Sequence, residues 1–276
     1  MAYRCFDVEI SEGVAHVRMN RPDELNSMVR EFWTELPEIV DGISDAGSAR
    51  VVVLSSTGKH FCAGMDLGVF AAVPHADAEP GRRQAHTRSL VKVLQWTATC
   101  LEKARMPVLA AVQGGCIGGG VDLVTAADCR YATRDAFFVV QEIAVGMTAD
   151  IGTLQRLGRV VPEGVARELA FTGRRMPAER ALEVGLVQAL YDDHESLLKG
   201  TLDTAREIAS RSPLAIWGTK VAMNYARDHG VDDALDHIAT WQAGMFQPAD
   251  LMESFSAKAD KRATAYDDLL PEPKQL

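Results

Sequence analysis

The sequence lacks the features that build a disulfide framework, a metal site or a membrane span. Its five cysteines are an odd number, lie far apart and include no CxxC pair, so we expect reduced thiols. There is no HExxH motif, and the histidines do not cluster with cysteines at the spacing of metal ligands. The longest apolar stretch is interrupted by Asp122 and Asp128, so no run reaches membrane-spanning length. We therefore expect neither a bound metal nor a membrane partner.

Positive charge and targeting signals are also scarce. Lys and Arg number 29 against 38 Asp and Glu, which gives a net charge of −9. This balance argues against nucleic acid as the main partner, because phosphate binding needs a basic face. The first residues lack the basic and apolar regions of a signal peptide, and the final PKQL is not a peroxisomal address. On these grounds we expect a soluble, cytoplasmic protein.

Several common catalytic motifs are missing as well. The glycines between Gly114 and Gly120 fit neither the dinucleotide fingerprint nor the P-loop, which argues against NAD and ATP. There is no GxSxG elbow, so an α/β-hydrolase is excluded. Cys62 lies beside a glycine turn, but no histidine and acid accompany it in the pattern of a thiol nucleophile. We expect no cofactor.

The 276 residues, 47% of them hydrophobic, are enough for one substantial core with an appended element. Hydrophobic patterning predicts strands at residues 3–10, 14–19, 51–55, 107–113 and 135–140. Helices are predicted from Asn26 or Ser27 toward residue 43, and over 91–103, 116–127, 152–161 and 177–184, the last of which stops at Gly185. Residues 74–88 show no clean period and are predicted to form a mobile loop or lid.

From residue 196 onward the pattern is almost all helix, broken at Pro213, Gly230 and Pro248. We therefore predict an α/β fold, with a core that carries the active site over residues 1–195 and a helical oligomerisation region over 196–276. Six apolar residues at helical spacing exceed what this region needs to cover itself, which favours a subunit interface. They are Leu214, Ile216, Val221, Leu235, Ile238 and Trp241, which are among the apolar positions of the region.

Three segments carry candidate chemistry, and each follows a predicted strand: residues 61–66, 114–122 and 141–150. Two glycine turns can direct two backbone N–H groups at one oxygen, which is the oxyanion hole that an enolate requires. The third segment supplies two carboxylates, Glu142 and Asp150. From these residues alone, simpler explanations stay open. The glycine cluster could be a packing joint, Asp150 a helix N-cap, Asp122 a buried helix-start carboxylate and Glu142 a surface acid.

The sequence resembles the crotonase (enoyl-CoA hydratase/isomerase) superfamily over nearly its whole length. The strongest matches are GGCIGGGVDLVTAADCRYA and QEIAVGMTADIGTLQRLGRV. Within the superfamily it is most similar to the Δ3,5-Δ2,4-dienoyl-CoA isomerases. The resemblance implies a spiral of ββα units with a C-terminal helical trimerisation region, an acyl-CoA substrate of which coenzyme A is part, and a homotrimer or dimer of trimers.

The resemblance also implies roles for individual residues. Ala63 and Gly119 would supply the oxyanion-hole amides, and the CoA pocket would be lined by Ala63, Gly64, Met65, Asp66 and Leu67. Ordinary hydratases carry glutamate at the positions of Asp122 and Glu142 and glycine at that of Asp150, whereas the dienoyl isomerases carry aspartate at the last. The resemblance therefore implies isomerisation of 3,5- to 2,4-dienoyl-CoA in fatty-acid β-oxidation.

In this scheme Asp150 is the base at C2 and Glu142 the acid at C6, while Asp122 tunes the pair or hydrogen-bonds to it. Two alternatives remain. One is an enoyl-CoA hydratase that adds water to a 2-trans-enoyl-CoA. The other is a non-catalytic crotonase-like protein that binds RNA or acts as a scaffold. Lost carboxylates and a basic helix would favour this last alternative, and the sequence shows neither.

Overall fold

The computed structural model describes residues 3–70 and 78–273, in which two sheets form the centre of an α/β fold. The larger sheet has the strand order β1-β2-β3-β4-β6-β9, and the smaller one has the order β5-β7-β8. β1 and β2 form an antiparallel hairpin, and every later pairing in the larger sheet is parallel. The strands are β1 Phe6–Ser11, β2 Val14–Met19, β3 Val51–Ser56, β4 Val108–Val112, β5 Gly115–Ile117, β6 Cys129–Thr133, β7 Phe137–Val139, β8 Met176–Pro177 and β9 Ala189–Tyr191.

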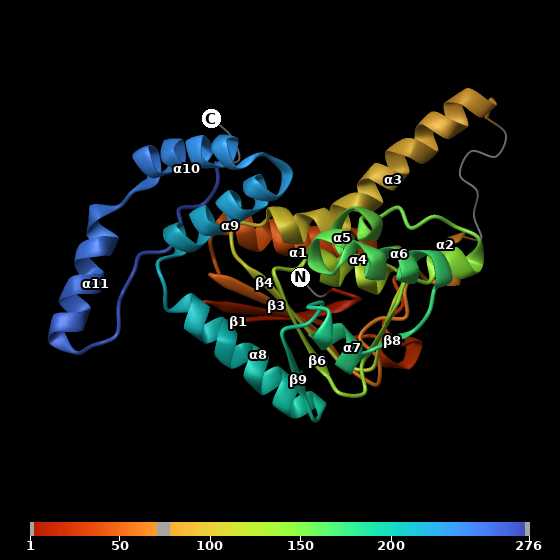
Figure 1. Cartoon of the computed structure of the whole chain (residues 1–276), viewed down its shortest axis with the longest axis horizontal. Coiled ribbons are helices and arrows are strands. Elements are labelled where there is room, and N and C mark those ends of the chain that lie inside the picture. The colour runs from red at the N-terminus through yellow and green to blue at the C-terminus, as the bar shows by residue number, and fades with distance from the viewer. Residues whose placement is uncertain (1–2, 71–77, 274–276) are drawn as a thin grey trace.

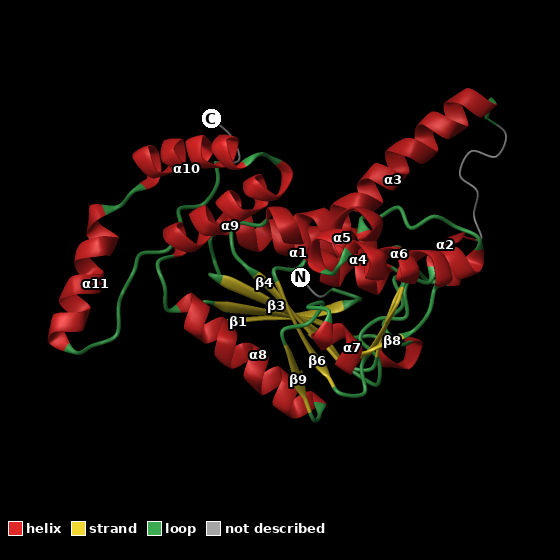
Figure 2. Ribbon diagram, in the orientation of Figure 1, coloured by secondary structure: helices red, strands yellow, loops and turns green. Residues whose placement is uncertain are grey.

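Helices cover both faces of the larger sheet. Every residue of β3 and β4 is buried, as expected for strands rich in Val, Leu and Ala in a parallel sheet covered on both sides. The helices before the tail are α1 Phe32–Ala46, α2 Leu67–Phe70, α3 Pro80–Lys103, α4 Gly119–Ala126, α5 Thr153–Val160, α6 Glu163–Thr172, α7 Ala178–Glu183 and α8 His194–Ala209. Figure 2 shows the strands between α8 on one side and α1 with α3 on the other.

Two predicted boundaries are wrong. Residues 80–88 are not a loop but the first turns of α3; residues 74–77 of that prediction lie outside the described residues. The helix begins at Pro80, and the Glu79 side chain caps it by accepting hydrogen bonds from the N–H groups of Gly81 and Arg82. This half of α3 projects away from the body (Figure 1), so no core-facing period marks it.

Helix α1 begins at Phe32, later than predicted from the capping residue types at Asn26 and Ser27. Asn26 instead adopts a left-handed conformation, with φ of 53°, and ties a turn together. Its side-chain amide donates to the carbonyl oxygens of Thr57 and His60, and its Oδ1 accepts the Arg21 N–H. The sequence analysis also missed β6 and α6, and β7 is shorter than the predicted strand.

The helical tail is broken where the sequence predicts, because α9 Pro213–Asp228, α10 Val231–Met245 and α11 Pro248–Asp260 begin at or next to Pro213, Gly230 and Pro248. The predicted core boundary at residue 195 falls inside α8, however. Ala205 and Ala209 of that helix pack on β-strand residues, so α8 covers the sheet and belongs with the core. Figure 1 shows α10 and α11 standing away from the sheet. None of the helices within residues 3–70 and 78–273 combines the length and apolar character needed to cross a membrane.

Candidate active site

The two glycine turns predicted to form the site lie side by side. Cys62 and Cys116 pair as a parallel bridge, in which the Cys62 N–H donates to the Gly115 carbonyl at 3.1 Å and the Ile117 N–H donates to the Cys62 carbonyl at 3.0 Å. Gly64 has a φ of 89°, and a Cβ placed on it would lie 3.1 Å from the carbonyl oxygen of Ile117. The first turn can approach the second this closely only because a glycine occupies this position.

The second turn leads directly into α4. Gly118 adopts φ 53° and ψ −118°, a conformation that favours glycine, and Gly119 is the first residue of the helix. The Gly119 N–H has no intrahelical partner at this position, and it points out of the positive end of α4. A Cβ on Gly119 would lie 2.6 Å from the sulfur of the buried Met28. The Gly119 amide is thus an open donor, and its place in an oxyanion hole stays a prediction.

The Ala63 amide is not open, which argues against its predicted place in the oxyanion hole. The Ala63 N–H donates to the Leu25 carbonyl at 3.0 Å. Met28 pairs with the next part of the turn, because its N–H donates to the Gly64 carbonyl at 2.8 Å and its carbonyl accepts the Asp66 N–H at 3.1 Å. This pairing turns the Met65 N–H toward the opposite side, where it has no hydrogen-bond partner among the described residues. The open amide of the first turn is therefore that of Met65.

The rest of the predicted CoA-binding segment follows on the same turn. The Asp66 carboxylate accepts hydrogen bonds from the Ser27 hydroxyl at 3.2 Å and from the Gly68 N–H at 2.8 Å. Leu67 begins the short helix α2. The segment from Ala63 to Leu67 thus runs from the glycine turn to the start of a helix, and the two hydrogen bonds of Asp66 hold its backbone in place.

Asp122 lies on the first turn of α4 and is 1% exposed. Its Oδ1 accepts the Thr153 N–H at 2.6 Å, while its Oδ2 is buried without a partner. Burial raises the pKa of Asp122 to about 7, and the negative charges of Glu142 and Asp150 raise it as well, against the opposing effect of the Thr153 hydrogen bond. This carboxyl group caps the start of α5 from a neighbouring helix.

Glu142 opens the short 3-10 helix Glu142–Val145 and is half-buried. Its Oε1 lies 3.3 Å from the point that a Cβ on Gly118 would occupy, so the carboxyl group rests against the second glycine turn. Its Oε2 is buried without a hydrogen-bond partner. Burial raises the pKa of Glu142, and the charge of Asp150 raises it further. Both influences favour a proton on Glu142.

Asp150 ends the loop before α5 and is the most exposed of the three carboxyl groups, although partial burial still raises its pKa. It does not cap α5: the capping residue is Gly152, which offers no side chain, and the Thr153 N–H is taken by Asp122. The N-cap explanation of Asp150 is therefore wrong. Asp122, Glu142 and Asp150 lie close enough for their charges to affect one another.

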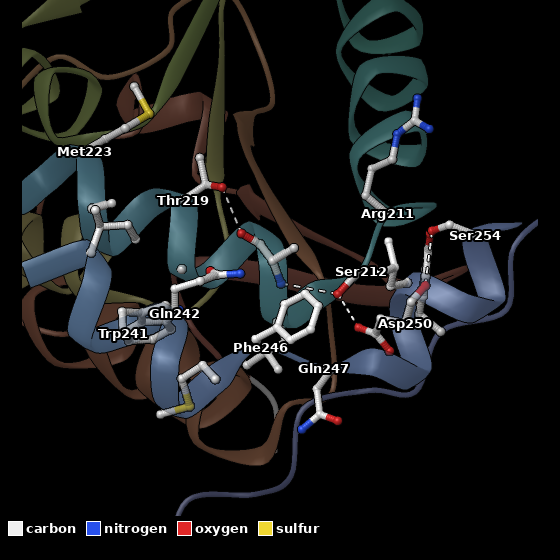
Figure 3. Close-up of a pocket in the computed structure, with 18 residues that line it drawn as sticks. Arg211, Ser212, Thr219, Met223, Trp241, Gln242, Phe246, Gln247, Asp250 and Ser254 are labelled. Carbon is white, nitrogen blue, oxygen red and sulfur yellow. Dashed lines mark hydrogen bonds between the residues drawn. The ribbon is translucent and has the colours of Figure 1, made fainter. Parts of the chain in front are cut away.

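Other candidate groups are structural. Burial raises the pKa of Cys62 to about 12, so this residue is a thiol at neutral pH and is a poor nucleophile. His60 accepts the Gly115 N–H through Nδ1 at 2.8 Å and supports the glycine turn. A cavity of about 630 Å³ lies between α9, α10 and α11 and contains none of the predicted site residues. Figure 3 shows side chains that line it, among them Trp241 and Phe246.

The chain is similar to known proteins over most of its length. Residues 9–269 match the family model described as enoyl-CoA hydratase/isomerase. The mitochondrial Delta(3,5)-Delta(2,4)-dienoyl-CoA isomerase of Mus musculus is 44% identical over 91% of this chain and 78% of its own length, and that of Homo sapiens is 44% identical over 90% and 77%. A peroxisomal protein of the same name from Arabidopsis thaliana is 39% identical over 90% of this chain and 91% of its own length. These relatives reside in organelles, so the expectation of a cytoplasmic protein is contradicted.

Solved structures confirm the crotonase-type fold. A crystal structure of an enoyl-CoA hydratase from Bacillus anthracis has a TM-score of 0.84 and 29% identity, covering 95% of this chain and 99% of the other. One from Mycobacterium tuberculosis H37Rv has a TM-score of 0.81 and 28% identity, covering 95% and 98%. Sequence and fold together establish that the chain belongs to the enoyl-CoA hydratase/isomerase family.

Proposed function

We propose that this enzyme isomerises 3,5-dienoyl-CoA to 2,4-dienoyl-CoA in fatty-acid β-oxidation, through an enolate of the thioester. The observation that carries the proposal is the mutual electrostatic influence of Asp122, Glu142 and Asp150, with Asp122 on the first turn of α4 and Glu142 against the glycine turn that leads to Gly119. The names of the relatives that are 44% identical over nine-tenths of the chain point to the same reaction. Coenzyme A enters as part of the substrate, and no step needs a separate cofactor.

The amides of Gly119 and Met65 form the proposed oxyanion hole. Removal of a proton from C2 places negative charge on the thioester oxygen, and two fixed N–H donors stabilise that charge more than they stabilise the neutral carbonyl. The Gly119 donor benefits from the positive end of α4. In this proposal Met65 replaces Ala63, whose N–H is already bound to Leu25.

Asp150 and Glu142 carry out the two proton transfers. Asp150 removes a proton from C2, the electrons of that bond form the C2–C3 double bond, the existing double bonds shift by one position, and C6 takes a proton from Glu142. The two residues need opposite starting protonation states. The more exposed Asp150 suits the ionised base, and the half-buried Glu142, whose pKa is raised further by Asp150, suits the protonated acid.

Asp122 has a supporting role in this proposal. Its hydrogen bond to Thr153 fixes the start of α5, three residues after Asp150. Because it is more deeply buried than the other two, it holds its proton up to about pH 7. It therefore adds little repulsion when Asp150 is ionised at lower pH.

Hydration is the less favoured alternative. The solved hydratases are 28–29% identical to this chain, well below the 44% of the relatives named as isomerases. A carboxylate at position 150 provides a third acid–base group that water addition by two glutamates does not use. The two reactions are separable by ultraviolet absorbance, because the dienoyl product gains conjugation with the thioester whereas hydration removes it.

The Asp150→Asn variant tests the assignment. Asparagine keeps the shape of the side chain and removes its basicity, so isomerisation of a 3,5-dienoyl-CoA should fall by about 10²–10⁴ with little change in melting temperature. Normal turnover by this variant would contradict the role of Asp150. A wild-type enzyme that hydrates crotonyl-CoA efficiently and ignores the diene would replace the isomerase proposal with hydration.

The tail is the proposed subunit interface of a homotrimer or dimer of trimers. α10 has no buried residue in the single chain, and none of the six apolar residues identified in the sequence is buried. Large apolar side chains are exposed along this region, among them Met223, Leu235, Met252 and Phe255, at 58–70%. A second subunit would bury this surface, including the mouth of the cavity in Figure 3.

A further inference from the structure

One face of α3 points at the loop that carries Asp150. Gln95, Thr99 and Glu102 are separated by four and three residues, so they lie on the same side of the helix. All three line a polar cavity of about 370 Å³ together with Ile151 and Gly152, the two residues that follow Asp150. None of the three carries a role in the proton transfers described above.

Gln95 contacts Asp150 directly. Its Nε2 donates a hydrogen bond to the Asp150 backbone carbonyl at 2.8 Å. The contact joins residues 55 positions apart and reaches the backbone of the base, leaving its carboxylate free to react. It is a neutral hydrogen bond at the edge of the protein, so its net contribution to global stability is about 1 kcal/mol.

Thr99 and Glu102 act on the same loop through Arg156. The Arg156 guanidinium donates to Glu102 Oε2 at 2.6 Å and to the Thr99 hydroxyl at 3.1 Å. Its Nη1 lies against Gly152, where a Cβ would be 1.8 Å from that nitrogen, and Gly152 has a φ of 138° that favours glycine. The loop thus closes against an arginine that α3 holds in place.

The Glu102 end of this arrangement is rigid. Glu102 is 8% exposed, and its second oxygen accepts a hydrogen bond from Arg227 of α9 at 2.5 Å. Asn224, one turn earlier on α9, donates to the Glu102 backbone carbonyl at 3.2 Å. A buried carboxylate that accepts hydrogen bonds from two guanidinium groups is held in one orientation. The cluster therefore joins α3, which carries Glu102, to α5 and α9, which carry Arg156 and Arg227.

We propose that Gln95 is a positioning residue for Asp150, and that it acts together with the Arg156 guanidinium held by Thr99 and Glu102. The inference rests on the proposed function, because it concerns the placement of the base in that reaction. Gln95 of α3 binds the backbone before Ile151, at the Asp150 carbonyl, and Asp122 of α4 binds the backbone after it, at the Thr153 N–H. Two separate helices therefore hold this loop. Misplacing a reacting group by about 1 Å can cost about 10² in rate.

The test is a kinetic comparison of Gln95→Met with the wild type on 3,5-octadienoyl-CoA, followed by the absorbance of the conjugated product. Gln95→Met should lower kcat by about 10–100-fold and leave KM within about twofold, because the Gln95 amide is engaged with the Asp150 backbone and the inference gives it no part in substrate binding. Gln155→Met is the matched control. The Gln155 side chain lines the same cavity and has no hydrogen bond within the described part of the chain, so the kcat of Gln155→Met should equal that of the wild type.

A double variant separates positioning from a general structural effect. If Gln95 acts only through the base, then adding Gln95→Met to Asp150→Asn should cost nothing further, whereas independent effects would multiply. Wild-type kcat in Gln95→Met, or a full additional loss in the double variant, would overturn the inference. Failure of the proposed function has a different signature, because the Asp150→Asn single variant would then be as active as the wild type, or the wild type would not convert the diene.

Discussion

Replacing Asp122 by asparagine should stabilise the protein in a manner that depends on pH. The carboxyl group is 1% exposed and has one oxygen without a partner, so its ionised form is poorly solvated. Asparagine has the same shape, keeps an oxygen that can accept the Thr153 N–H, and never ionises. The substitution therefore removes the cost of burying a charge while it retains the cap of α5.

The magnitude follows from the pKa of Asp122, which burial raises from its ordinary 3.8 to about 7. A difference of about three pKa units, at about 1.36 kcal/mol per unit, corresponds to about 4 kcal/mol. The folded state binds this proton more tightly than the unfolded state does. The associated stability is fully present below about pH 4 and is lost as the pH rises through about 7.

Urea unfolding of the wild type and of Asp122→Asn, at several pH values from 5 to 8.5, measures this effect. The free energy of unfolding of Asp122→Asn relative to the wild type should rise with pH, and the gap should level off above about pH 7.5. An advantage that stays constant with pH would mean that Asp122 titrates normally. A wild type that is the more stable protein at pH 8 would refute the argument from burial altogether.

Two further predictions concern the oxyanion hole and the assembly. Gly119→Val should lower kcat/KM by about 10²–10³, the cost of one oxyanion donor, because the valine side chain meets the Met28 sulfur and blocks the amide. Circular dichroism checks the fold of the variant. A folded variant with near-normal turnover would remove Gly119 from the site. Sedimentation at micromolar concentration should give trimers or hexamers, whereas a monomer, or a Leu235→Glu variant that assembles normally, would contradict an interface at α10.

The elements that sequence reasoning found are those with a local chemical signature. β3 and β4 are continuous apolar runs, which a strand buried on both faces requires. The breaks at Pro213, Gly230 and Pro248 were found because proline and glycine constrain the backbone independently of the fold around them. Gly185, with φ of 84°, is another glycine whose own backbone preference marks the end of a helix.

The elements that it missed depend on what packs against them. The first half of α3 has no buried face, so its sequence shows no apolar residues repeating at helical spacing. Only the Glu79-Pro80 cap marks its start. Asn26 has the chemistry of an N-cap, but its side chain is used by carbonyl groups more than thirty residues away. Preferences of single residues cannot reveal such distant partners.

The same limit explains the site. A glycine cluster before a helix exposes N–H groups whatever surrounds it, and the resemblance points to the N–H of Gly119 among them. The choice between Ala63 and Met65 depends on the pairing of Met28 with this turn, which lies more than thirty residues from Met28 in the sequence. Gly64 and Asp66 bind Met28 from one side of this turn, and because successive N–H groups in extended backbone face opposite sides, the N–H of Met65 between them faces away.

The departures at positions 122 and 150 from the two-glutamate pattern of hydratases are connected through one hydrogen bond. Asp122 uses an oxygen to hold the Thr153 N–H at 2.6 Å, so this carboxyl group is occupied at the start of α5. The same α5 start follows Asp150, whose carboxylate is the more exposed and does not serve as a cap. In the proposed mechanism the acid at 122 serves as a cap, and another residue is the reacting base. The loop that this cap fixes, also bound by Gln95, is where Asp150 lies.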